Sequence, residues 1–285
     1  MTEKRFVLLV LVLICLGIYL FVSAPPPLQD EQAEGPAIPV EQLFAVVEAE
    51  NDAVRALWTR DIVGSGTKAG LKFDEHWRDA DLEAGPLPAL FLRETARSLE
   101  RNPVRLSLFL GSEFPINDAN RFEGLQLDRF RILRQTGEAQ FFFMPDTGLH
   151  VGMFSDVAIA EPCVTCHNQH EQTPKTDWRL NDVMGATTWL YPAERVSLEE
   201  FLVAVTALHQ AFEDAYRDYI RKVGTFAEPP VIGERWPAEG FYLPTPEVFM
   251  AEVRRRTAPA TLSALSLMVS KPPVEARESG DAPRP

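Results

Sequence analysis

The cysteines Cys163 and Cys166, with His167 directly after the second, form the sequence feature that most constrains this chain. The 285-residue chain has three cysteines, and the third, Cys15, lies far away in an apolar N-terminal run. A disulfide scaffold would need more cysteines at wider spacings, so the fold has to rest on an apolar core. C-x-x-C-H is the attachment signature of c-type haem, in which two thiols bond to the porphyrin vinyl groups and the histidine binds iron. The sequence therefore predicts one covalent haem c on Cys163 and Cys166, with His167 as the proximal iron ligand.

Three other interpretations of the same cysteines remain open. A zinc site needs four ligands, and His170 is available as a third, but there is no second cysteine pair. A thiol-redox pair usually opens a helix in a βαβ unit, whereas this motif is predicted in a Pro-, Asn- and Thr-rich loop after a hairpin. A disulfide between residues three positions apart is strained. Haem attachment is the interpretation that the motif favours.

The sixth iron ligand is not fixed by the sequence, because His, Met and Cys all serve in that position. Met153 and His150 lie on the strand predicted to lead into the motif and are the first candidates, followed by Met144 and His76. Core packing is the commoner role of a methionine. His170 is expected to be a solvated loop residue. An open sixth site that accepts a gas is an equal alternative.

The N-terminus predicts a compartment. Lys4 and Arg5 precede an unbroken apolar run over residues 6–22, which would span about 25 Å as a helix. The run is longer than the ~7–15 residues of the apolar region of a signal peptide, so a retained single transmembrane helix over 1–22 is favoured over a cleaved signal. The positive flank predicts a single-pass protein of the bacterial inner membrane, with its main domain in the periplasm and a Pro-rich linker over 23–39.

The rest of the chain predicts an α+β fold. A haem-binding domain with flanking helices is expected over 40–224, an irregular C-terminal extension over 225–270 and a disordered tail over 271–285. The sheet is expected to be antiparallel and covered by helices on one face. Periodicity and turn residues predict strands over 104–110, 140–144, 149–159 and 183–190, and helices over 40–63, 87–99, 121–135, 197–223 and 246–256.

Charge and motifs exclude several function classes. The net charge of −13 gives a surface that repels phosphate backbones, so no nucleic-acid partner is expected. The sequence has no Ser-His-Asp order, P-loop or Gly-rich dinucleotide signature, so no enzyme activity is predicted.

The stretch from about Gly85 to Pro192 resembles a family of exported PAS-like sensor domains with a c-type haem, long catalogued as a domain of unknown function. The resemblance implies a PAS-like antiparallel sheet with haem against it, and it assigns attachment to Cys163 and Cys166 and iron ligation to His167. Family members can place a distal cysteine near the end of the first helix, but residues 56–66 contain none. The pieces that carry the resemblance are PLPALFLRETARSLERNPVRLSLFLGSEFPINDANRFE, FFFMPDTGLHVGMFSDVAIAEPCVTCH and DVMGATTWLYP.

Two functions follow as expectations. The resemblance favours a redox or gas sensor whose change of state is read by a protein partner, since no output domain follows. The alternative is a single-haem electron-transfer cytochrome whose acidic surface docks on a membrane complex.

Overall fold

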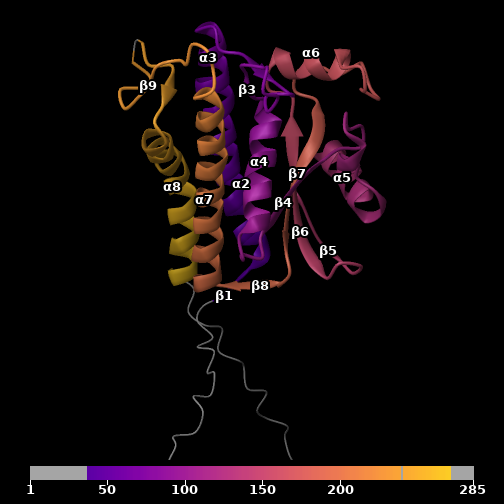
Figure 1. Ribbon diagram of the computed structural model, residues 1–285. Helices are drawn as coiled ribbons and strands as arrows, with labels where there is room; N and C mark the ends of the chain where they lie inside the picture. The colour runs from indigo at the N-terminus through magenta and orange to yellow at the C-terminus, as the bar shows by residue number, and fades with distance from the viewer. Residues whose placement is uncertain (1–36, 239, 271–285) are drawn as a thin grey trace, which may run out of the picture. The chain divides into compact units, whose positions relative to one another are not determined.

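A computed structural model describes residues 37–238 and 240–270, in which a four-stranded antiparallel sheet packs against long helices (Figure 1). The chain is therefore an α+β protein. The elements in chain order are β1 (Ala37–Pro39), α2 (Val40–Ala56), η1 (Leu57–Gly64), α3 (Ser65–Lys68), β2 (Phe73–Asp74), β3 (Gly85–Pro86), α4 (Pro88–Arg101), β4 (Ser107–Gly111), η2 (Asp118–Asn120), α5 (Gly124–Thr136), β5 (Gln140–Met144), β6 (Leu149–Val157), α6 (Glu161–Gln169), β7 (Val183–Tyr191), β8 (Arg195–Ser197), α7 (Leu198–Val223), β9 (Ile232–Gly233), β10 (Leu243–Pro244) and α8 (Pro246–Ser270).

The expected fold class included an N-terminal transmembrane helix, and this part of the expectation is corrected. No helix within residues 37–238 and 240–270 is long and apolar enough to cross a membrane. The apolar run over 6–22 lies outside the described residues, as do residues 23–36 of the expected linker and the tail over 271–285. The fold class supported by the structure is therefore α+β without a membrane-spanning helix in the described part.

The main sheet has the strand order β4-β7-β6-β5, with every neighbouring pair antiparallel. The predicted hairpin is present: β5 and β6 pair from Gln140–Met153 to Met144–Leu149, and Gly148 closes the turn with φ +69°. A conformation with positive φ favours glycine, so this turn residue fixes the register of the hairpin.

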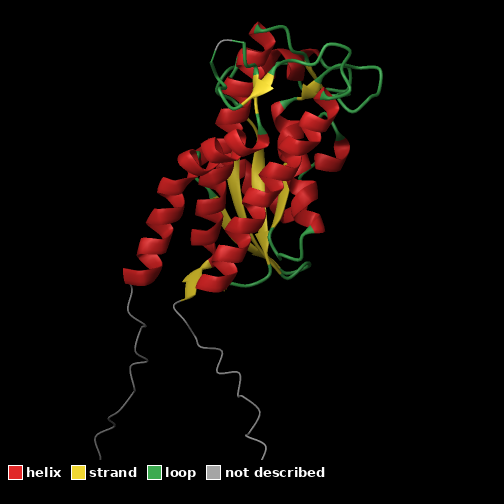
Figure 2. Ribbon diagram, turned by 60° about the vertical axis from the view of Figure 1, so that its left-hand side comes forward, coloured by secondary structure: helices red, strands yellow, loops and turns green. Residues whose placement is uncertain are grey.

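Helices cover both faces of this sheet, whereas the sequence predicted one (Figure 2). One face carries α2 and α4. The other face carries α5, whose Phe130 and Leu133 pack with Met153 and Ala186 of the sheet. The strand residues alternate accordingly, so that each face of β6 contributes to a different apolar cluster.

The helices on the α2 side pack together around large aromatic side chains. The ring of Trp58 in η1 stacks on Phe91 of α4 at 4.2 Å between centroids. Tyr216 of α7 stacks on Phe249 of α8 at 4.0 Å. All four side chains are buried, so the helices from the two ends of the described chain share one core.

Several local predictions are confirmed, and others are wrong. Ser197 and Glu200 form the predicted capping box at the start of α7. Residues 37–39, expected in the linker, form β1 and pair with β8. The expected first helix continues as a π-helix, η1, and the C-terminal extension contains one 25-residue helix, α8, that passes through Pro259.

Gly152 tests the packing of α2 on the sheet. A Cβ at this position would lie 2.7 Å from the ring of Phe44, which is fully buried in α2. We expect Gly152→Ala to lower the free energy of unfolding by about 1–3 kcal/mol through overpacking. Urea unfolding measures the change, and Thr147→Ala in the exposed hairpin turn is the control. Equal stability of the two variants would contradict this packing.

Candidate functional site

The C-x-x-C-H motif lies on α6, a nine-residue helix, and not in the predicted loop. Pro162 stands in the first turn, where its missing N–H costs nothing, and Glu161 places an acidic group at the positive helix end. The helix lies at the end of the sheet opposite the β5–β6 turn (Figure 1). The motif therefore has a regular backbone.

The helix brings the three motif side chains to one side. Residues three and four positions apart share a helix face, which applies to Cys163, Cys166 and His167. Both cysteines are free thiols; Cys163 is half-buried and Cys166 is exposed. Two unbonded thiols beside an imidazole are the donor set that c-type haem attachment requires.

A small apolar cluster lies beneath the first half of α6. Cys163 and Val164 pack against a group that includes Trp178 and Met184. The second half of α6 is held by Asn168, whose amide accepts from Trp178 N at 2.8 Å and donates to Trp178 O at 2.9 Å. Neither Trp178 nor Met184 could be linked to the motif from the sequence, because this contact joins residues that the fold brings together.

The surroundings of His167 shift the pKa of its imidazole. Burial lowers the pKa of His167, and the nearby charge of Asp156 opposes that shift without reversing it. A neutral ring keeps a nitrogen lone pair available for a metal. A lowered pKa of His167 therefore suits an iron ligand.

Cys166 is poorly suited to thiol-redox chemistry. Partial desolvation of the thiol, and then the nearby carboxylate of Glu75, raise the pKa of Cys166. Reactive thiols of redox pairs have a lowered pKa, because the thiolate is the nucleophile. The position of the motif at a helix start would favour the redox interpretation, but the electrostatics of Cys166 oppose it.

The segment between β2 and β3 reaches α6 through Glu75, whose carboxylate lies 3.1 Å from His170 Nε2. His170 is therefore half-buried against this segment and not a solvated loop residue. His76, the last of the candidate sixth ligands, follows Glu75 directly on this segment and has an exposed side chain.

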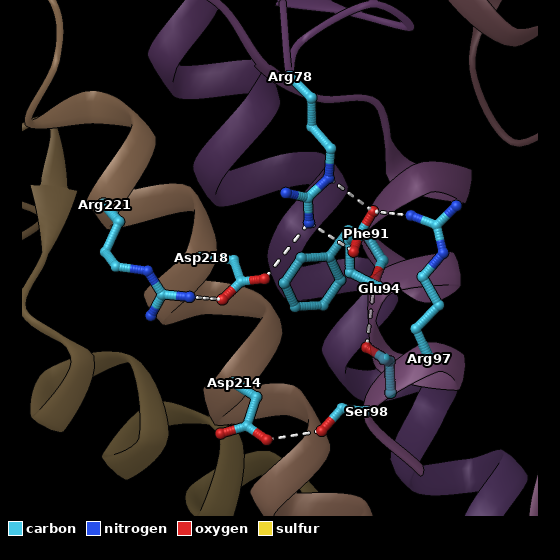
Figure 3. A network of polar contacts seen from close by, with 9 residues as sticks. Arg78, Phe91, Glu94, Arg97, Ser98, Asp214, Asp218 and Arg221 are labelled. Atoms are coloured by element: carbon cyan, nitrogen blue, oxygen red, sulfur yellow. Dashed lines mark hydrogen bonds and ion pairs between the residues drawn. The ribbon is translucent and has the colours of Figure 1, made fainter. Parts of the chain in front are cut away.

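Arg78 anchors this segment to α4 and α7 (Figure 3). Its guanidinium donates to Glu94 at 2.7 Å and 3.3 Å and to Asp218 at 3.3 Å. Glu94 is buried and also accepts from Arg97 at 2.7 Å. Two arginines satisfy the charge of this one buried carboxylate. The contacts of Arg78 therefore hold the segment that faces α6 in place.

The other candidate sixth ligands lie elsewhere. Met153 is fully buried under α5, on the sheet face opposite Asp156. The ring of His150 lies 4.9 Å from that of Phe143, tilted by 49°, near the hairpin turn. This is six residues, or roughly 20 Å of strand, before Asp156, and Met144 lies beside the same turn. The structure therefore brings Cys163, Cys166 and His167 together, but it does not bring Met153 or His150 to them.

The part of the chain that the structure describes contains no group of three His, Cys, Asp or Glu side chains arranged to hold a metal ion. The zinc interpretation of the two cysteines therefore lacks a ligand set in that part.

A buried acidic group that the sequence alone did not reveal lies between α2 and the sheet. Glu48 is 5 % exposed, and its carboxylate accepts from Trp189 Nε1 at 2.6 Å. Burial, and then the charge of Asp52, raise the pKa of Glu48 to about 8. Two helical turns further along α2, Arg55 forms an ion pair with Asp156 of β6. The sequence feature that could have revealed this group is a set of charged residues on an otherwise apolar face of the helix. These residues follow Glu48 by four and seven positions.

These features define an α+β domain in which a helix bearing C-x-x-C-H covers one end of an antiparallel sheet. A family model described as Tll0287-like matches residues 42–192, which run from α2 to the end of β7, and the chain belongs to this family. The family is a domain of unknown function. No curated protein and no solved structure matches the chain.

The raised pKa of Glu48 predicts a pH-dependent stability. Between about pH 4.5 and pH 8 the folded protein keeps the Glu48 proton and the unfolded chain releases it, so the free energy of unfolding falls as pH rises. The contribution of one proton is at most about 1.4 kcal/mol per pH unit. We expect Glu48→Gln to remove this part of the slope in urea titrations at pH 5.5, 6.5 and 7.5. Glu138→Gln, in an exposed loop, should keep the wild-type slope, and an unchanged slope in Glu48→Gln would contradict the assignment.

Proposed function

We propose that this chain binds one c-type haem through thioether bonds at Cys163 and Cys166, with His167 as an iron ligand. The observation that carries the proposal is the placement of two free thiols and a half-buried imidazole on one side of α6. Haem supplies an iron that changes oxidation state and binds small ligands. The protein contributes the two thiols, the imidazole and a fixed support beneath them.

The proposed role is a redox or gas sensor of the periplasm, read by a protein partner. Its support is the path from the motif helix to the long helix α2: β6 leads directly into α6, and Asp156 near the end of β6 forms an ion pair with Arg55 of α2. A change at the iron then reaches an element that also contacts α7 and α8. A sensor needs such a connection, whereas an electron carrier does not.

The second candidate is a single-haem electron-transfer cytochrome. The observation that favours it is the net charge of −13, which suits docking on a basic partner. An absorption spectrum, oxidised and reduced, with and without CO, separates the two roles. A CO-induced spectral change supports the sensor, whereas a six-coordinate haem that ignores CO and exchanges electrons rapidly supports the carrier.

Covalent attachment is tested by mass and by variants. Expressed with a cytochrome c maturation system, the protein should be coloured and gain the mass of one haem. The double variant Cys163→Ser/Cys166→Ser should lose the adduct, because a serine hydroxyl does not form the thioether. Cys15→Ser is the matched control, since Cys15 is the only cysteine outside the motif, and it should keep the adduct. A colourless wild-type protein, or an adduct that survives the double substitution, would rule out the proposal.

A further inference from the structure

Three arginines form a row along one side of α4. Arg93, Arg97 and Arg101 follow one another at intervals of four residues, which places them on successive turns of one helix face, about 6 Å apart along the axis. The whole chain has 41 acidic and 28 basic side chains, so the row runs against the overall charge balance. Like charges four residues apart destabilise a helix, so this arrangement has a cost that a binding role would explain.

The row lies on the solvent side of α4. Arg97 and Arg101 are exposed, and Arg93 is half-buried. Ser98 points the other way and donates to Asp214 of α7 at 2.6 Å. Figure 3 shows Arg97 on the side of α4 away from α7. The row is therefore open to a partner.

Two of the three guanidinium groups lack an acidic partner. Among the residues that the structure describes, neither Arg93 nor Arg101 forms an ion pair or a side-chain hydrogen bond, and the exposed acid Glu100 pairs with none of the row. Arg97 donates to Glu94 at 2.7 Å. Burial, and then the charge of Arg97, lower the pKa of Arg93, and the charge of Glu94 opposes that shift without reversing it. A carboxylate brought to Arg93 would therefore meet a half-buried cation that has no counter-charge of its own.

We propose that the row formed by Arg93, Arg97 and Arg101 docks an acidic helix of a protein partner, whose carboxylates repeat every four residues. Such a helix presents its carboxylates about 6 Å apart along the axis, which matches the spacing of the arginines. A guanidinium binds a carboxylate through two parallel hydrogen bonds, so each pair adds geometric specificity as well as charge. A nucleic acid or an anionic membrane extends beyond the row and is repelled by the net charge of −13, whereas a single helix contacts the row alone.

The row is connected to the surroundings of α6 by polar contacts. Arg97 shares the carboxylate of Glu94 with Arg78, which lies on the segment between β2 and β3. Glu75 of the same segment contacts His170, the residue directly after α6. A partner on the row therefore lies beside contacts that reach the motif helix, and docking itself requires no haem.

The test is a fluorescence-anisotropy titration of the purified protein with labelled synthetic helical peptides. One peptide carries glutamates at every fourth position, and a second peptide of the same composition carries them in one contiguous block. We expect tighter binding of the first peptide, with an affinity that falls as salt is added. Arg93→Gln/Arg97→Gln/Arg101→Gln should weaken this binding about tenfold, the combined effect of three exposed ion pairs.

Arg60→Gln/Arg195→Gln/Arg254→Gln is the matched control, because it removes the same charge from exposed positions on three separate elements, and it should keep the wild-type affinity. Arg93→Gln/Arg101→Gln spares the ion pair on the buried carboxylate, so it provides a second variant if the triple substitution does not fold, and it should still weaken binding severalfold. Equal losses in the row and control variants, equal affinity for the two peptides, or tighter binding to phosphatidylglycerol vesicles than to the first peptide would overturn the inference.

Discussion

The burial of α2 is the constraint on which the rest of the structure depends. Only Ala45, Ala49 and Asp52 of this helix are exposed. Its two buried glutamate side chains point in different directions. Glu48 faces Trp189 of the sheet, and Glu50 contacts His209 of α7 at 3.0 Å and Thr261 of α8. A buried carboxylate without a partner is costly, so rotation of α2 about its axis would break both sets of contacts.

This fixed rotation determines what lies near the motif helix. Arg55 follows Glu48 by seven residues, or about two turns, and so lies on the same face of α2. The contact of Glu48 with the sheet therefore places Arg55 against β6, where it meets Asp156. Asp156 in turn belongs to the strand that leads directly into α6. The geometry of α2 thus connects the buried contact of Glu48 with Trp189 to the strand that carries the C-x-x-C-H helix.

Local signals in the sequence were sufficient for the elements that form from neighbouring residues. The capping box at Ser197 and the β5–β6 hairpin depend on residues a few positions apart, and both were predicted. The helix at α6 was missed because Pro and Asn around the motif indicate a loop, whereas Pro162 occupies a first-turn position that a helix accepts.

Features that depend on contacts between residues far apart in sequence could not be predicted from local signals. The cover of α5 on the second sheet face, the pairing of β1 with β8 and the cluster of Trp178 with Met184 beneath α6 join residues far apart in sequence. The motif residues of the candidate site could be named from the sequence because their spacing carries the chemistry. Asp156 and Arg55 could not, since each is an ordinary charged residue until the fold brings the two together.

The helices α7 and α8 lie beyond the residues matched by the family model, yet they complete the enclosure of α2. Glu50 of α2 contacts both of them, and the aromatic core joins them to α4 and η1. A displacement of Arg55 is therefore resisted by contacts on the opposite side of the same helix. Densely packed elements move as units, so a change at Asp156 that moves α2 would be carried to α7 and α8. In the proposed sensor, these two helices are where a protein partner would detect the state of the iron.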